Sequence, residues 1–339
     1  MATDDADSPE EIERTQSIAA DELDDDREGA NSAQDSRSAP SCPVCESPDS
    51  VVYLEGDSMA EKSEATNAES AGANRSDERT GTVLRCKQCK LGFRESRPDE
   101  AALAKFYQEQ DVEPYLSEIA GRRWTARRHW ELVKPLMLRG HVLDVGCGSG
   151  LFLEQVGRAG WTGTGIEPSP ALCDHARKRM SNRVNIICGT LESSGFPPRL
   201  FDVVTLWDVL EYTPRPADCL RESSVPLKPG GYVLLNVPYI DSSSAQFLGR
   251  SWPLLRREHL NYFSRESLLR CAHAAGLTLE RFGRRSAIFS LGYLMRRLAE
   301  REIPLASGLL TLFSNLNIEE WLVPVPLGEI VAIYRKPEL

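Results

Sequence analysis

The chain has 339 residues and a formal net charge of −10, which is enough sequence for one large domain and a smaller one. The charge is concentrated at the start, because residues 1–40 contain 13 acidic residues against three arginines. The remainder is close to neutral, so the acidic balance excludes little about what the folded part binds. With few large apolar residues, residues 1–40 are expected to form a disordered acidic tail.

The sequence also bears on the compartment of the protein. Its start lacks the basic residues and the apolar run of a secretory signal. The longest apolar run, at 303–313, is too short to span a bilayer. Nine cysteines, four of them in two Cys-x-x-Cys pairs, suit a reducing compartment better than a disulfide framework. We therefore expect a cytoplasmic protein without a transmembrane segment.

Two Cys-x-x-Cys pairs lie within residues 41–97, separated by a polar stretch at about 57–81 that has the composition of a flexible insertion. The four residues are Cys42, Cys45, Cys86 and Cys89. Four thiolates from two tight turns can form a closed tetrahedral site, which leaves no coordination position open for chemistry. Redox-active or incidental cysteines are the alternative. The pattern predicts a zinc-ribbon-like module with a structural Zn²⁺.

Residues 98–139 show apolar positions at helical spacing, and Pro98 and Asp99 suit a helix start. We expect a helical linker or cap over this range. Within it, residues 121–130 combine four arginines with two tryptophans, a mixture that could form a nucleic-acid surface. The favoured interpretation is an amphipathic helix with its arginines in water and its tryptophans docked on the following domain.

From about residue 140 onward, apolar runs alternate with helical patterns. Strands are expected at 141–146, 163–167, 184–189, 201–209 and 231–238, and helices lie between them. This alternation predicts an α/β fold with a doubly wound, largely parallel sheet. Two further strands are expected at 277–285 and 328–336, around an apolar helical insertion at about 286–326. That insertion could cover the site, form a homodimer face or rest on a membrane surface.

The stretch VLDVGCGSG (142–150) places three glycines in a five-residue window directly after the first strand. Backbone with so many glycines is expected to bend sharply and to come close to a ligand. In an open α/β sheet, ligands bind beyond the carboxyl ends of the strands. A dinucleotide fingerprint needs glycine or alanine where this chain has Leu151, and a phosphate-binding Lys-Ser/Thr pair is absent.

The order Asp-x-Gly-x-Gly-x-Gly resembles the first motif of class I S-adenosylmethionine-dependent methyltransferases, and further motifs follow in that family's order across residues 130–339. The resemblance implies a Rossmann-like seven-stranded sheet over 140–339 and S-adenosyl-L-methionine as cofactor. The matching cofactor-binding positions are Asp144, Gly146, Gly148, Gly150, Glu167, Thr190, Leu191, Trp207 and Asp208.

The resemblance also assigns a role to several of these side chains. Glu167 would accept hydrogen bonds from both ribose hydroxyls of the cofactor, and Thr190 and Leu191 would border its adenine. Trp207 and Asp208 would line the pocket after the fourth strand. An exposed strand-end carboxylate is the alternative for Glu167, and a core position is the alternative for Trp207.

Residues 249–277 resemble the stretch after the fifth strand in a methyltransferase subgroup linked to ubiquinone-type and saccharide modification. His259 is the candidate catalytic base there, since an unperturbed imidazole with a pKa of about 6.5 suits base work. The alternative is a structural histidine that bonds the loop to the sheet edge. Glu211 is a second catalytic candidate, whereas Tyr212 stands where the family often has histidine. Arg256 and Arg257 could meet an anionic substrate or simply be solvated.

The resemblance implies a methyltransferase acting at oxygen or carbon of a small molecule or a saccharide. An RNA methyltransferase with a zinc recognition module is one alternative, because some ribosomal-RNA guanine methyltransferases carry a cysteine-rich module before this fold. Outside residues 85–97 the module has few basic residues, which argues against nucleic acid as a partner. A non-catalytic cofactor-binding adaptor, whose zinc ribbon docks a protein, is the other alternative.

Overall fold

The computed structural model describes residues 40–56, 81–300, 312–313, 315–316 and 318–338. The predicted acidic tail, apart from its last residue, and most of the predicted insertion at 57–81 lie outside the described residues. Within the described ranges, no helix is long and apolar enough to cross a membrane.

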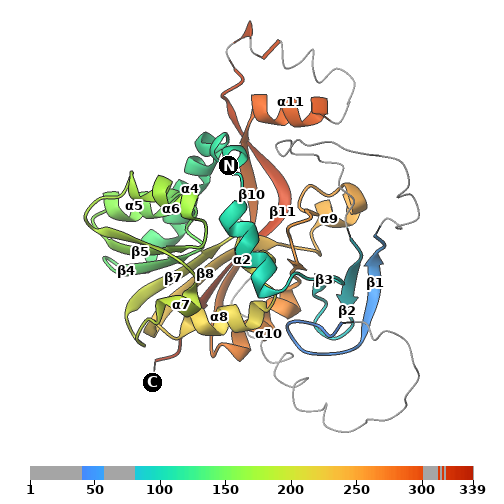
Figure 1. The fold of residues 1–339 in the computed structure, drawn as a ribbon, viewed down its shortest axis with the longest axis horizontal. Helices are drawn as coiled ribbons and strands as arrows, with labels where there is room; N and C mark the ends of the chain where they lie inside the picture. The colour runs from blue at the N-terminus through green and yellow to red at the C-terminus, as the bar shows by residue number, and fades with distance from the viewer. Residues whose placement is uncertain (1–39, 57–80, 301–311, 314, 317, 339) are drawn as a thin grey trace.

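A seven-stranded sheet forms the centre of the molecule, in the order β10-β11-β8-β7-β4-β5-β6 (Figure 1). Five strands are parallel: β4 (His141–Val145), β5 (Thr162–Glu167), β6 (Val184–Cys188), β7 (Phe201–Trp207) and β8 (Leu227–Pro238). The antiparallel pair β10 (Thr278–Ser290) and β11 (Leu322–Arg335) completes the edge next to β8. The strand order reverses between β4 and β7, where a crevice opens in sheets of this kind.

Helices cover both faces of this sheet. On one face lie α4 (Ile119–Val133), α5 (Leu151–Arg158) and α6 (Pro170–Arg177). On the other lie α7 (Leu191–Ser194), α8 (Pro216–Ser224) and α10 (Arg265–Ala274). Each group shares its own apolar cluster with the strands. The predicted Rossmann-like, mostly parallel architecture is confirmed.

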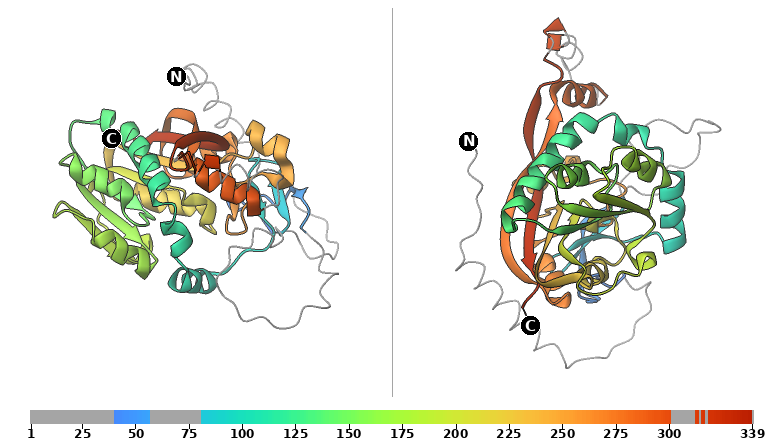
Figure 2. Two further views of the ribbon diagram at one scale, coloured as in Figure 1. Left: turned by 90° about the horizontal axis from the view of Figure 1, so that it is seen from above. Right: turned by 90° about the vertical axis from the view of Figure 1, so that its left-hand side faces the viewer.

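The cysteine pairs lie in a second, four-stranded sheet of order β1-β2-β3-β9. Its first three strands are β1 (Ser50–Leu54), β2 (Val83–Cys86) and β3 (Gly92–Arg94), and all of its pairings are antiparallel. The fourth, β9 (Asn261–Tyr262), comes from the large domain. This small sheet lies on the opposite side of the molecule from β4–β6 (Figures 1 and 2).

Residues 98–139 are largely helical, in α2 (Glu100–Glu109), α3 (Glu113–Leu116), α4 and the 3-10 helix η2 (Lys134–Leu136). The Asp99 carboxylate accepts a hydrogen bond from the Ala102 amide at 2.7 Å and so caps α2. In α4, Trp130 packs edge-on against Trp161, whereas Trp124 is 40% exposed. Only one of the two tryptophans therefore docks on the domain.

The segment around 286–326 has narrower helical bounds than the sequence indicated. Strand β10 continues to Ser290, α11 spans Leu291–Glu300, and β11 begins at Leu322. Long antiparallel pairing between β10 and β11 extends both strands past the ends that their local sequence suggests. The remaining short elements are η3 (Leu210–Tyr212), α9 (Ser243–Leu248) and η4 (Gly249–Ser251).

Candidate functional site

The turn after β4 requires glycine. Gly146, Gly148 and Gly150 have φ values of 69°, 54° and 76°, in the left-handed region that side chains disfavour. A Cβ at Gly146 would lie 2.8 Å from Val209 Cγ2, and one at Gly148 would lie 2.6 Å from the Tyr115 hydroxyl. Both backbone conformation and space therefore restrict these positions to glycine, and the turn leads directly into α5.

Asp144 lies beneath this turn and is 2% exposed. Its Oδ1 accepts a hydrogen bond of 2.6 Å from the Thr205 hydroxyl on β7. Burial raises the pKa of Asp144 to about 7, although the bond from Thr205 opposes this. The carboxyl group thus ties β4 to β7 at the place where the strand order reverses.

Glu167 points at the glycine turn from the end of β5. Its Oε2 accepts a hydrogen bond from the Gly148 amide and its Oε1 accepts one from the Ser169 amide, both at 2.8 Å. Burial raises the pKa of Glu167, and the two amide donors oppose that rise. Each carboxylate oxygen still has a lone pair for another donor. The structure therefore brings Glu167 and the turn together, as their spacing suggested.

The other sequence-derived cofactor residues follow β6 and β7. Thr190 begins α7 in a capping box with Ser193, and Leu191 is the first residue of that helix. Trp207 stacks on His129 with ring centroids 3.8 Å apart, so much of its ring packs between α4 and the sheet. This is the packing expected of the core alternative. Asp208 is exposed.

The helical cap contributes a tyrosine that the sequence interpretation did not single out and an arginine that it assigned to solvent. The Tyr115 hydroxyl adjoins Gly148, and the guanidinium of Arg122 lies 3.9 Å above the Tyr115 ring. Desolvation raises the pKa of Asp208, and the hydrogen bond from Asn236 and the charge of Arg122 oppose that rise. The Nε of Arg122 is buried without a hydrogen-bond partner among the described residues. No sequence motif marks Tyr115 or Arg122, which lie on different helices, and amphipathicity alone placed the arginine in water.

His259 is buried, at 3% exposure, and both of its ring nitrogens are occupied. Nδ1 lies 2.9 Å from the Leu254 carbonyl and must donate to it, so Nε2 accepts from the Tyr212 hydroxyl at 3.1 Å. Burial lowers the pKa of His259 to about 3, and the nearby charge of Arg256 adds to this. This geometry does not support the expected role as catalytic base, because a buried imidazole with two partners neither reaches a substrate nor readily accepts a proton. It fits the structural alternative.

His259 is therefore expected to stay neutral across the physiological range. Its ring nitrogen shifts in a ¹⁵N NMR titration should not change between pH 5 and pH 8. In the unfolded chain the His259 imidazole binds a proton below about pH 6.5, whereas in the folded protein it does so only near pH 3. His259 therefore lowers the free energy of unfolding as the pH falls from about 6.5 toward 3. A titration midpoint near 6.5 would contradict the buried, doubly bonded geometry.

Carboxyl groups gather where β7, β8 and β11 meet. Glu211 is 1% exposed, and its Oε2 has no hydrogen-bond partner in the described ranges. Burial raises the pKa of Glu211 well above the usual range, and the charge of Asp208 adds to this rise. Burial also raises the pKa of half-buried Glu329 to about 8, and Asp208 adds to it. Asn236 donates to Asp208 Oδ1 at 2.5 Å. Glu329 and Asn236 were missed because no local motif marks them; β11–β8 pairing brings Glu329 here.

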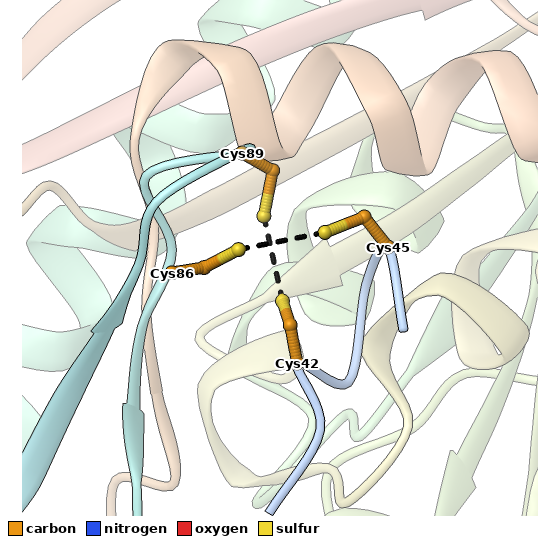
Figure 3. Close-up of side chains that lie close together, drawn as sticks. All are labelled: Cys42, Cys45, Cys86 and Cys89. Carbon is orange, nitrogen blue, oxygen red and sulfur yellow. Dashed lines mark hydrogen bonds between the residues drawn. The ribbon is translucent and has the colours of Figure 1, made fainter. Parts of the chain in front are cut away.

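The four paired cysteines converge on one point (Figure 3). Their sulfur atoms all lie within 4.8 Å of one another, with Cys42 Sγ to Cys89 Sγ at 3.4 Å and Cys45 Sγ to Cys86 Sγ at 3.5 Å. A tetrahedral zinc with Zn–S bonds of about 2.3 Å places its sulfurs about 3.8 Å apart. The donor set and its spacing could therefore hold a metal ion.

The comparisons with known proteins agree with this fold. Residues 116–281 match a family model described as a methyltransferase domain. A ubiquinone biosynthesis O-methyltransferase of Coxiella burnetii is 35% identical over 29% of this chain and 44% of the relative. One of Thiobacillus denitrificans is 28% identical over 55% of this chain and 86% of the relative. The chain thus spans less than half the length of the first of these relatives.

Among solved structures, a methyltransferase of Thermotoga maritima that uses S-adenosylmethionine is 21% identical, with a TM-score of 0.45, over 68% of this chain and 97% of that one. Residues 116–281, just under half of the chain, are therefore similar to a methyltransferase domain.

Proposed function

We propose that the chain transfers a methyl group from S-adenosylmethionine to a hydroxyl group of a small molecule. The observation that carries this proposal is the Glu167 carboxylate, held beside the glycine turn with lone pairs left for a ribose diol. The names of the curated relatives favour oxygen as the atom that is methylated. A saccharide hydroxyl is the second acceptor class.

On the cofactor side, the glycine turn gives room for the nucleoside and Glu167 would hold its two hydroxyls. Thr190 and Leu191, which lie at the start of α7, would border the adenine. Arg122, with its buried and unpaired Nε, would meet the amino-acid carboxylate of the cofactor. The cofactor supplies an activated methyl group, so the protein contributes mainly by positioning the two reactants.

On the acceptor side, the carboxyl groups of Asp208, Glu211 and Glu329 would receive the hydroxyl. Of these, Glu329 suits the removal of the hydroxyl proton best, because its pKa of about 8 is close to the working pH. Glu211, kept protonated by burial, would donate a hydrogen bond to the acceptor instead. His259 would hold Tyr212 in place.

The four cysteines would bind a structural Zn²⁺. All four positions of a tetrahedral ion would be filled by sulfur, so the ion would stabilise the fold without taking part in the chemistry. None of the nine cysteines, all of which lie in the described ranges, forms a disulfide, and a reducing compartment such as the cytoplasm would suit them.

The test is production of S-adenosylhomocysteine by the purified full chain, with acceptor pools of catechols, saccharides and RNA, alongside calorimetry of S-adenosylmethionine binding. We expect cofactor binding and turnover with catechols or saccharides. Turnover with RNA alone would overturn the proposed acceptor class. Cofactor binding with background turnover on every pool would identify an adaptor, and no cofactor binding would refute the proposal as a whole.

Replacing Glu167 with glutamine should weaken S-adenosylmethionine binding by roughly 10- to 100-fold, because each charge-assisted hydrogen bond contributes about 1.5–3 kcal/mol. Calorimetry measures this directly. The matched control is Glu131→Gln on α4, where the carboxylate is exposed and pairs only with Lys134 at 3.5 Å. Equal affinities for the two variants would remove Glu167 from the cofactor site.

A further inference from the structure

We infer that the four-cysteine module fixes the acceptor side of the site, so that metal binding at the cysteines determines the position of the segments that face the acceptor. Those segments are η3 (Leu210–Tyr212) and residues 256–264, called here the acceptor-side segments. The word acceptor rests on the proposed function. The mechanical link between the module and these segments rests only on the contacts below.

The first link is a shared sheet. Strand β3 of the module pairs with β9 of the large domain, with Gly92 opposite Tyr262 and Phe93 opposite Asn261. The Arg94 amide continues this ladder by donating to the Leu260 carbonyl at 3.0 Å. Residues 260–262 are therefore held along one side by the backbone of the module.

The second link is the guanidinium of Arg94, a residue only 6% exposed. Its Nε donates to the His259 carbonyl at 2.9 Å and its Nη2 donates to the Arg256 carbonyl at 2.7 Å. A buried cation needs such acceptors, and buried carbonyls need such a donor. Loss of this side chain would leave the buried His259 carbonyl without this donor. It would also remove one of the donors to the Arg256 carbonyl, which accepts from the His259 amide and the Tyr262 hydroxyl as well.

The third link runs to η3 through Asn261, which is fully buried. Arg97 of the module donates from Nη2 to Asn261 Oδ1 at 2.6 Å. Asn261 Nδ2 then donates to the carbonyls of Leu210 and Thr213, at 2.9 and 2.7 Å. The Leu260 amide also donates to the Glu211 carbonyl at 2.6 Å. Two successive hydrogen bonds, from Arg94 to Leu260 and from Leu260 to Glu211, thus connect the module to the backbone of Glu211, a candidate catalytic residue.

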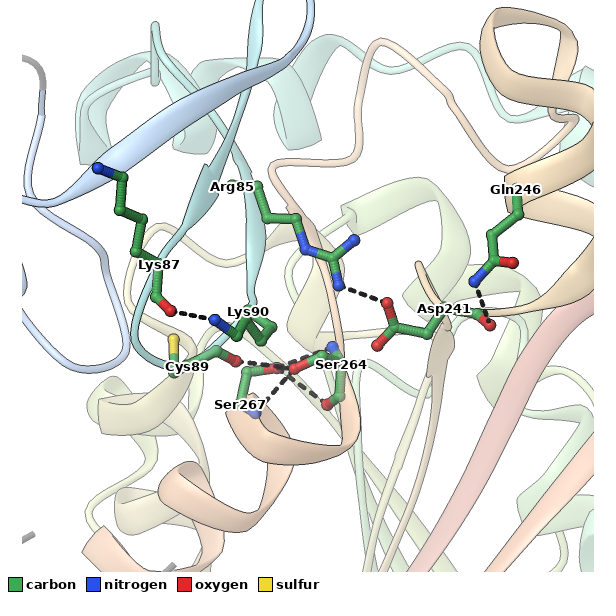
Figure 4. Close-up of polar contacts among 8 residues, drawn as sticks. All are labelled: Arg85, Lys87, Cys89, Lys90, Asp241, Gln246, Ser264 and Ser267. Atoms are coloured by element: carbon green, nitrogen blue, oxygen red, sulfur yellow. Dashed lines mark hydrogen bonds and ion pairs between the residues drawn. The ribbon is translucent and has the colours of Figure 1, made fainter. Parts of the chain in front are cut away.

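The fourth link starts at the metal-binding turn itself (Figure 4). The carbonyl of Cys89 accepts a hydrogen bond of 2.8 Å from the Ser264 hydroxyl, which also caps α10. Cys42, Cys86 and Cys89 belong to the same apolar cluster as Phe263 and Leu268. Movement of this turn on metal loss would therefore act directly on the end of the 256–264 segment.

The cofactor side is held by other contacts. Glu167 is fixed by the amides of Gly148 and Ser169, and Asp144 by Thr205, all within the large domain. Removal of the metal is therefore expected to loosen the acceptor-side segments and to leave the glycine turn in place.

Hydrogen–deuterium exchange of the full chain, with zinc bound and after stripping with the chelator TPEN, tests this. We expect peptides covering 84–94, 208–214 and 256–264 to lose protection together, while peptides covering 141–158 keep theirs. Unchanged exchange at 256–264 alongside lost protection at 84–94 would overturn the inference. Equal loss everywhere would also overturn it, because the effect would then not be confined to the acceptor side.

A substitution that spares the cysteines separates the link from the metal itself. Arg94→Met, or Arg97→Met if the first variant fails to fold, should retain one zinc per chain and S-adenosylmethionine affinity within twofold of wild type. Exchange at 256–264 should rise and methyl transfer should fall at least tenfold. Wild-type exchange at 256–264 in the folded variants would refute the link.

The matched control is Arg85→Met. Arg85 lies in the same module, but its guanidinium pairs with Asp241 rather than with a residue of the acceptor-side segments (Figure 4). Its loss should raise exchange near 241–248 and leave 256–264 protected. Because the exchange measurements require no acceptor, they can fail or succeed independently of the proposed methyl transfer, which the cofactor calorimetry and turnover assays test.

Discussion

Gly146→Val abolishes S-adenosylmethionine binding, weakening it at least 100-fold, if the turn after β4 holds the cofactor. The φ of 69° at this position is strained for any side chain and more so for a β-branched one. The new Cβ would also lie 2.8 Å from Val209 Cγ2, so the turn or its neighbour must shift. Isothermal titration calorimetry on the purified variant measures the loss.

The control for this variant is Gly160→Val. Gly160 has a φ of 80°, so valine brings similar backbone strain, yet a Cβ there meets nothing within 4 Å. Its loop lies between α5 and β5, outside the turn. We expect reduced stability but wild-type cofactor affinity. If Gly146→Val folds and binds with the wild-type dissociation constant, the cofactor does not lie against this turn.

Cys86→Ser is expected to lose the bound metal, because a hydroxyl is a poor substitute for a thiolate on zinc. Metal analysis should fall from one zinc per chain to near zero. Part of the binding free energy of a structural zinc is folding free energy, so the midpoint of thermal unfolding should drop by roughly 5–10 °C.

Cys188→Ser provides the comparison for the cysteine change. Cys188 is exposed at the end of β6 and does not belong to the four-cysteine cluster. Zinc content and thermal midpoint should match wild type. Full zinc retention by Cys86→Ser would show that the cluster is not a four-sulfur site.

The parts of the site that the sequence predicted are those with local signals. The glycine turn was evident because glycine occupies three alternate positions directly after a strand, and the structure gives all three a left-handed backbone. Glu167 could be placed because it ends the strand that follows α5, and parallel neighbours bring their carboxyl ends together. The strands themselves follow from apolar runs.

What the sequence could not give depends on contacts between distant residues. Glu329 reaches the carboxyl cluster only through the pairing of β11 with β8. The environment of His259 is set by Leu254, Tyr212 and Arg94, and a loop position says nothing about how deeply such a ring is buried. Likewise, the guanidinium of Arg122 lies over the Tyr115 ring of a separate helix, a contact that helical spacing alone does not predict.

The two-residue strand β9 has a consequence for dividing this chain into pieces. A shortened chain beginning near residue 98 would uncover Tyr262 and Phe263, both fully buried in the intact protein. It would also remove the Arg94 donor from the buried His259 carbonyl, at about 1–3 kcal/mol for a group left unsatisfied, and one of the donors to the Arg256 carbonyl. The large domain and the four-cysteine module therefore cannot be exchanged between proteins as independent parts, and any chimaera must carry both β3 and β9.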